Sequence, residues 1–97
     1  VFRRDNDILL RMGGEEFAVL MPGTDLEHAQ QMAEQFRACI ADNPLQAREH
    51  SLNLTTSLGV GTFEAERDCS SEAFFQRIDS ALFQAKADGR NRLVLAR

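Results

Sequence analysis

Two adjacent glutamates, Glu15 and Glu16, follow two glycines and precede an apolar run in the segment RMGGEEFAVLMPG, residues 11–23. Carboxylates in a glycine-rich turn are often simply solvated. Here they adjoin the apolar run, which predicts that at least one of them is held close to a packed sheet. A divalent ion keeps adjacent carboxylates ionised in such a place, and Mg²⁺ favours one or two carboxylates together with substrate phosphates. Because Gly13 and Gly14 lack side chains, a bulky ligand can approach the backbone at this turn.

The sequence around the two glycines predicts a β-hairpin. Apolar runs at residues 8–10 and 17–21 flank Gly13-Gly14, and glycine supplies the positive φ angles that tight turns need. The second run is apolar at successive positions, as in a strand covered on both faces. The glutamates are therefore expected at the start of a buried strand, which Pro22-Gly23 ends.

A helix is expected over residues 25–42, between the hairpin and Asn43-Pro44. Thr24 and Glu27 have the spacing of a capping box, in which two side chains satisfy free backbone N–H groups at the helix start. Apolar residues recur on one face of this segment, which predicts that it packs on the core. They are Leu26, Ala29, Ala33, Phe36 and Ile40.

A second helix is expected to open at Ser70-Ser71-Glu72, with Gly89 as its C-terminal cap. Its apolar stripe consists of Phe74, Ile78, Ala81, Leu82 and Ala85.

Two further strands are expected. Apolar residues alternate with polar ones and glycines over residues 52–60, and Leu93-Val94-Leu95 forms a last strand. Gly59 and Gly61 allow another backbone or a ligand to come close. The predicted order is strand, strand, helix, strand, helix, strand, which gives an α+β fold with helices packed on a sheet.

Composition limits the function classes. The chain has 97 residues, 43% of them hydrophobic and 27% charged, with a net charge of −4. One core at most is expected, and the lack of a basic run argues against nucleic acid as a partner. Cys39 and Cys69 have no metal-ligand spacing, so we expect free thiols buried as small hydrophobes in a reduced, cytoplasmic protein. The sequence starts at Val1 without an initiator methionine, and we expect it to be an excerpt of a longer polypeptide.

The segment Gly13-Gly14-Glu15-Glu16-Phe17 resembles the signature turn of the GGDEF domain, with glutamate in the third position in place of aspartate. GGDEF domains are the diguanylate cyclases that join two GTP molecules into cyclic di-GMP. The similarity continues through TSLGV at residues 56–60 and IDSALFQAKADGRN at residues 78–91. The resemblance implies a nucleotide-cyclase-like (ferredoxin-like palm) fold with an antiparallel-rich sheet, of which residues 1–97 are the C-terminal part, without the N-terminal strand and helices.

The resemblance also implies roles for the residues of the turn. Glu15 matches a metal ligand that is essential to catalysis, and Glu16 matches a residue that supports metal and nucleotide. The metal is Mg²⁺ or Mn²⁺. Gly13 and Gly14 match the glycines that make room for GTP.

Two basic residues near the end of the second expected helix, Lys86 and Arg90, match the family's cationic pair that grips the β- and γ-phosphates. Without a ligand, basic residues near a helix C-terminus gain ~0.3–1 kcal/mol from the helix dipole, so a purely structural role is the alternative.

The reaction needs a 3′-hydroxyl of one GTP to attack the α-phosphorus of another. Because each domain is expected to hold one GTP, a two-fold symmetric product suits two domains that face each other in a homodimer.

Arg4 and Asp7 match the family's RxxD motif, which binds the product cyclic di-GMP at an inhibitory site. The arginine fork can bond a guanine edge or a phosphate in two places at once. A surface ion pair, worth ~0–1 kcal/mol, is the alternative.

Three functional classes stay open. The first is an active cyclase in the complete parent protein, while this chain alone is inactive. An upstream sensory or regulatory domain is expected in that parent, and its attachment to a membrane sensor is left open. The second is a catalytically degenerate module that binds cyclic di-GMP or GTP as a sensor. The third is a structural dimerisation piece without a ligand. A complete member carries a further metal-binding aspartate and guanine-reading residues on a central strand and helices, which are expected upstream of Val1.

Overall fold

The computed structural model describes residues 8–13, 16–20 and 23–96. Its elements are β1 (Ile8–Gly13), β2 (Glu16–Leu20), α1 (Leu26–Asp42), β3 (Leu45–Ala47), β4 (His50–Leu52), β5 (Leu58–Val60), α2 (Ser71–Ala87) and β6 (Leu93–Leu95). This mixture of helices and small sheets confirms the α+β class.

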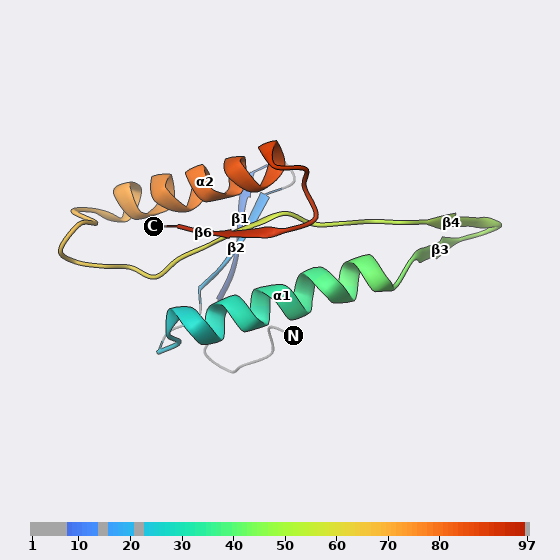
Figure 1. The fold of residues 1–97 in the computed structure, drawn as a ribbon, viewed down its shortest axis with the longest axis horizontal. Helices are drawn as coiled ribbons and strands as arrows, with labels where there is room; N and C mark the ends of the chain where they lie inside the picture. The colour runs from blue at the N-terminus through green and yellow to red at the C-terminus, as the bar shows by residue number, and fades with distance from the viewer. Residues whose placement is uncertain (1–7, 14–15, 21–22, 97) are drawn as a thin grey trace.

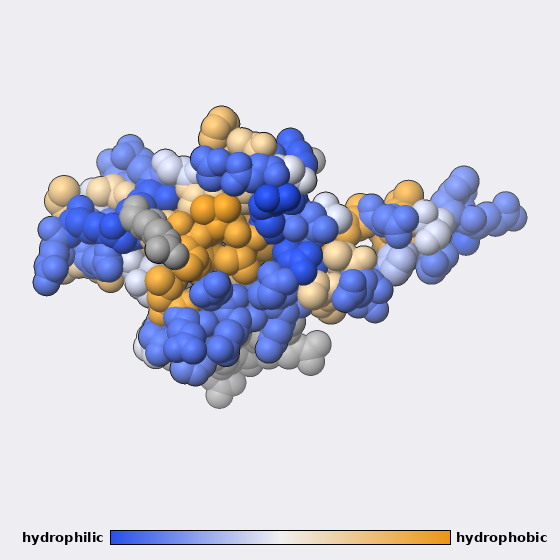
Figure 2. All heavy atoms as spheres, viewed as in Figure 1, coloured by the Kyte–Doolittle hydropathy of each residue, from blue (hydrophilic) through white to orange (hydrophobic). Residues whose placement is uncertain are grey.

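The centre of the fold is the parallel strand pair β5–β6, in which Leu58 lies opposite Leu93 and Val60 opposite Leu95. Both helices pack against this pair, α2 on one side and α1 on the other (Figure 1). Ala29 and Ala33 of α1 are buried against Val60, with larger apolar side chains partly buried around them. Figure 2 shows apolar side chains gathered between the two helices, over β6.

The glycines of the β5 segment bring α2 close to the strand. A Cβ atom on Gly59 would collide with the carbonyl oxygen of Ile78 and lie 2.7 Å from the nitrogen of Leu82. On Gly61, a Cβ atom would lie 2.7 Å from Cδ1 of Ile78. The expectation that another backbone approaches this strand is therefore confirmed for Gly59, and that backbone is the chain's own helix.

The β1–β2 hairpin is antiparallel, with Ile8 opposite Leu20 and a shift in register between Arg11 and Gly13. Its strands form no ladder with β5–β6. No Cα atom of the hairpin lies within 8 Å of a Cα atom in another described helix or strand. Within the described residues, the expected single sheet is thus present as separate strand pairs, because no described strand joins them.

The strand expected over residues 52–60 is instead two strands, which is a correction. Leu52 ends β4, and β5 begins at Leu58. An unexpected third strand, β3, pairs with β4 in an arm that extends away from the helices (Figure 1). Leu45 lies opposite Leu52 on this arm, and both are exposed. Alternation marks an extended chain but does not identify its pairing partners, which explains the error.

The N-terminal cap of α1 also differs from the expectation. Asp25 is the cap, and its Oδ1 accepts a hydrogen bond from the backbone nitrogen of His28 at 2.9 Å. Aspartate caps helices at least as well as threonine, so the helix begins one residue later than a cap at Thr24 would place it. The cap expected at Ser70 is confirmed, since its hydroxyl accepts from the nitrogen of Ala73.

Both cysteines are free, as expected, but Cys39 and Cys69 are exposed, so their expected burial is wrong. Cys39 lies on an outward position of α1, and Cys69 precedes the cap of α2. Neither position faces a core. In the described part of the chain, no helix has the length and apolar character needed to cross a bilayer.

Candidate active site

The candidate residues at the glycine-rich turn are only partly covered by the structure. Arg4, Asp7, Gly14 and Glu15 lie outside the described residues. The backbone is described at Gly13 and Glu16, which are cross-strand partners in the hairpin. The expected hairpin is therefore confirmed, with Glu16 at the start of its second strand.

The second group of candidate residues lies where α2 ends. Lys86 is in the last turn of the helix, and Arg90 lies three residues beyond it. The end of α2 is closed by two backbone hydrogen bonds: the nitrogen of Gly89 donates to the oxygen of Lys86, and the nitrogen of Arg90 donates to the oxygen of Ala85. This is the Schellman pattern, with glycine at the left-handed position. The C-cap residue is Asp88, and Gly89 follows it with a positive φ and ends the helix, as expected.

The Arg90 side chain is exposed, and no hydrogen bond or ion pair joins its guanidinium to a residue that the structure describes. The Lys86 side chain is partly buried. Two cationic groups thus lie four residues apart at the end of one helix, and no described residue occupies the donors of the Arg90 guanidinium. Such an arrangement can bind a phosphate or a carboxylate.

Sequence reasoning missed a side-chain network that reaches this turn from α1. Arg37 donates from Nη1 to Oδ1 of Asn91 at 2.8 Å and holds both carboxylate oxygens of Glu34 through Nε. The hydrogen bonds from Arg37 hold the pKa of Glu34 below its usual range, and the same bonds raise the pKa of Arg37. The spacing of Glu34 and Arg37 is a visible signal of an ion pair, whereas the link to Asn91 spans 54 residues and has none.

A second network that sequence reasoning missed lies at the opposite end of α2. Arg77 donates from Nε and Nη2 to the two carboxylate oxygens of Asp68, at 3.1 and 2.6 Å. It also donates to the backbone oxygens of Thr62 and Ala96. The hydrogen bonds from Arg77 lower the pKa of Asp68, which is buried. This network holds the loop before α2 and the end of β6 together.

The structure does not bring all candidate residues into one described cluster. No Cα atom of β1 or β2 lies within 8 Å of a Cα atom of α2. No three metal-ligating side chains gather among the residues whose side chains the structure describes. Two surface hollows lie elsewhere, one in the loop Glu64–Arg67 and one beside the start of α1.

Comparison with known sequences identifies relatives of the chain. Residues 1–92 match the family described as "Diguanylate cyclase, GGDEF domain". The chain is 44% identical over 93 residues to the diguanylate cyclase DgcP of Pseudomonas aeruginosa, covering 96% of this chain and 14% of that protein. It is 41% identical over 90 residues to the response regulator PleD of Caulobacter vibrioides, covering 91% of this chain and 20% of PleD.

Comparison with solved structures agrees. The GGDEF domain of DgcB from Caulobacter crescentus, in complex with c-di-GMP, superposes with a TM-score of 0.87 at 28% identity. The superposition covers 96% of this chain and 55% of that one. The diguanylate cyclase SiaD of Pseudomonas aeruginosa, in complex with its activator SiaC, superposes with a TM-score of 0.84 at 32% identity. It covers 96% of this chain and 35% of that one. The chain spans only a minor part of the length of the curated relatives that it matches, 14% of DgcP and 20% of PleD.

Proposed function

Because this chain belongs to the GGDEF domain family of diguanylate cyclases, we propose that it forms the C-terminal part of a domain that condenses two GTP molecules into cyclic di-GMP. The 3′-hydroxyl of each GTP attacks the α-phosphorus of the other, and pyrophosphate leaves from each. The coverage of 55% of the DgcB chain supports the view that residues 1–97 are one part of a larger domain.

The observation that carries the proposal is the end of α2. Arg90 stands exposed on the turn that closes the helix, four residues after Lys86. A triphosphate carries several negative charges, and paired cations neutralise them most effectively when one is a guanidinium that can bond two oxygens at once. We assign Lys86 and Arg90 to the β- and γ-phosphates of GTP.

The metal belongs to the other part of the proposed site. Carboxylate oxygens are the ligands that Mg²⁺ and Mn²⁺ take in proteins, so the donor set of Glu15 and Glu16 fits such an ion. Bound there, it would supply charge neutralisation at the reacting phosphate and a more acidic 3′-hydroxyl. Gly13 and Gly14 leave room for the nucleotide at the same turn.

The proposed partners follow from the product. Since cyclic di-GMP is two-fold symmetric, two copies of the domain, each holding one GTP, would form the working site. An upstream regulatory or sensory domain in a cytoplasmic protein fits the response regulator PleD and the SiaD–SiaC complex among the relatives.

The proposal is tested in the full-length protein that carries this domain. Glu15→Gln should lower cyclic di-GMP formation by at least about a hundredfold, because a neutral amide is a poor ligand for Mg²⁺. Arg90→Met should weaken binding of a non-hydrolysable GTP analogue by about 10- to 100-fold. Arg67→Met removes an exposed arginine from a remote loop and is the control, with no change expected.

Two results would contradict the proposal. Unchanged turnover in the Glu15→Gln protein would remove that residue from the mechanism. A parent protein that binds GTP or cyclic di-GMP with no turnover in the presence of Mg²⁺ would show a catalytically degenerate sensor.

We also propose that the chain of residues 1–97 alone makes no product, and any cyclic di-GMP formed by it would contradict that statement.

Product inhibition is a further part of the proposal, through Arg4 and Asp7. Arg4→Ala should weaken cyclic di-GMP binding by about 10- to 100-fold, since a bidentate charge-assisted contact is lost. The variant should still make product, and should continue at product concentrations that stop the parent. Calorimetric titration of cyclic di-GMP into both proteins measures the difference, and equal affinities would return the two residues to the status of a surface ion pair.

A further inference from the structure

The turn that carries Arg90 has an unusual backbone. Three consecutive residues have positive φ angles: Gly89 at 123°, Arg90 at 63° and Asn91 at 48°. Glycine adopts this region freely and asparagine more readily than most residues, but for arginine it is disfavoured. The Schellman hydrogen bonds at the end of α2 hold Gly89 and Arg90 in this conformation, and side chains from outside the helix contact the residues that follow.

Two arginine side chains contact this turn. Arg92 donates from Nε to the carbonyl oxygen of Arg90 at 3.1 Å. Arg37 of α1 donates from Nη1 to Oδ1 of Asn91 at 2.8 Å. The first contact is local, whereas the second ties the turn to a different helix.

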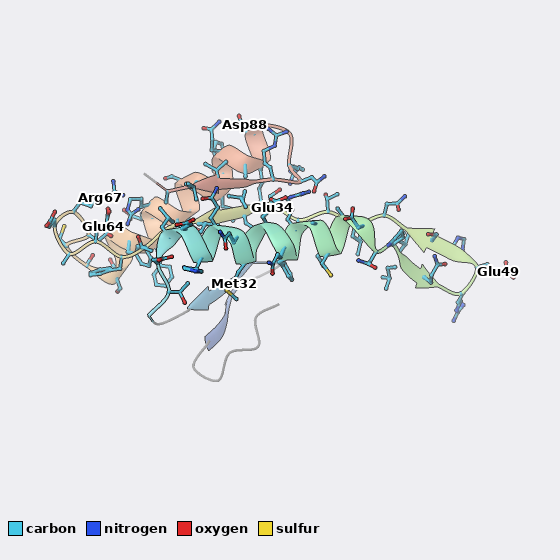
Figure 3. All side chains as sticks on the ribbon, turned by 60° about the horizontal axis from the view of Figure 1, so that its bottom comes forward. Met32, Glu34, Glu49, Glu64, Arg67 and Asp88 are labelled. Carbon is cyan, nitrogen blue, oxygen red and sulfur yellow. The ribbon has the colours of Figure 1, made fainter. Side chains whose placement is uncertain are left out.

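Arg37 is itself held in place. Glu34, one turn earlier on α1, accepts three hydrogen bonds from it, at 2.5, 2.9 and 3.0 Å. The Arg37 side chain is 21% exposed. Because a guanidinium is planar and presents its donors as a fixed fork, binding Glu34 along one edge aims the remaining Nη1 donor at Asn91. Figure 3 labels Glu34 on α1 and Asp88 at the end of α2.

We propose that Arg37 is a positioning residue for phosphate binding: through Asn91 it fixes the left-handed turn that aims the Arg90 guanidinium at the nucleotide. This inference rests on the proposed function of Arg90. Lys86 projects from α2 itself. The helix is held by its caps and by its contacts with β5, and these do not involve Arg37. Arg90 lies beyond the helix. Its backbone nitrogen is bonded to the oxygen of Ala85, and its position also depends on the contacts made by the rest of the turn. Fixing that position before GTP arrives lowers the ordering cost of binding.

A double-mutant cycle in the full-length protein tests the link. Arg37→Met removes the donor, and Asn91→Gly removes the acceptor while keeping a residue that accepts a φ of 48° without strain. Each single variant should weaken binding of a non-hydrolysable GTP analogue by about 5- to 10-fold. The double variant should bind no more weakly than the singles, because all three lack the same hydrogen bond. In turnover, KM should rise by more than kcat falls.

A matched control comes from the loop before α2. Arg67 forms an ion pair with Glu64 at the same spacing of three residues, and both are labelled in Figure 3, far from Asp88. Arg67→Met should leave GTP affinity unchanged. A merely structural role of Arg37 would lower the melting temperature while leaving the affinity of the folded protein unchanged, and that result would overturn the inference.

Arg90→Met separates failure of the inference from failure of the proposed function. If Arg90→Met weakens binding and Arg37→Met does not, the positioning role is wrong and the phosphate role stands. If Arg90→Met leaves the affinity unchanged, both are wrong. Additive losses in the double variant would also overturn the inference, since the two side chains would then act separately.

Discussion

The two ends of α2 are each held by an arginine network, and the two networks differ in burial. At the N-terminal end, the Arg77 and Asp68 side chains are 13% and 2% exposed. At the C-terminal end, the Arg37 and Glu34 side chains are 21% and 50% exposed. The first carboxylate is enclosed by protein, and the second is half in water.

Burial decides what each network contributes. Arg77 bonds a buried carboxylate and two backbone oxygens, and its guanidinium lies over the Phe74 ring at 5.5 Å. Removing such a group leaves several buried polar atoms without partners, which costs folding stability. Removing Arg37 leaves few polar groups without a partner, because water can reach Glu34 and take over its hydrogen bonds. The proposed contribution of the Arg37 network is therefore to position the turn at Arg90, and not to stabilise the fold.

The largest expected effect is that of Arg77→Met. The variant should lower the melting temperature of the domain by more than about 10 °C, because Asp68 stays buried without its cation. At a temperature where the variant is folded, its affinity for a GTP analogue should equal that of the parent. Calorimetry and titration measure the two quantities.

A second variant checks this explanation. Adding Asp68→Asn to Arg77→Met removes the stranded charge, so part of the lost melting temperature should return. If Arg77→Met weakened GTP binding as much as Arg37→Met does, it would be wrong that the Arg77 network serves folding stability and the Arg37 network serves GTP binding.

A medium effect is expected on acidification. Because the hydrogen bonds from Arg77 lower the pKa of Asp68 below its usual range, the carboxylate adds stability above its unfolded pKa of about 3.9. That contribution is lost as the pH falls through the folded pKa. The free energy of unfolding of the parent, measured in urea, should therefore approach that of Asp68→Asn as the pH falls from 6 to below about 4. Parallel curves for the two proteins would contradict this role.

Regular periodicity predicted the helices and most of the strands. The apolar spacing from Leu26 to Ile40 and the cap at Ser70 both describe contacts within a few residues, and both are confirmed. The errors occurred where the local pattern allowed two answers. Thr24 and Asp25 are both good caps. The alternation over residues 52–60 begins at the last residue of β4 and continues into β5, with no signal for the break in strand structure at residues 53–57.

The candidate site was predictable to a different degree. Lys86 and Arg90 were placed at the end of the second helix by sequence, and the structure confirms that position. The arginines that hold the helix ends were not predicted, because Arg77 and Arg37 find partners 19 and 54 residues away. Such contacts depend on how helices and strands pack together. Glu15, the predicted metal ligand, lies outside the described residues, so its role stays a prediction.

The smallest expected effect is that of Glu34→Gln. The amide keeps an oxygen that accepts from Arg37, so the guanidinium stays near Asn91 but loses its charged partner. Since Glu34 is 50% exposed, the lost attraction is screened by water and salt. We expect GTP binding to weaken by no more than about threefold at low salt and by less at high salt. Glu64→Gln, at the matched pair with Arg67, is the control without effect. A loss as large as that of Arg37→Met, at every salt concentration, would mean that the charge of Glu34 acts on the nucleotide site directly. The proposal that the network acts by positioning the turn at Arg90 would then be wrong.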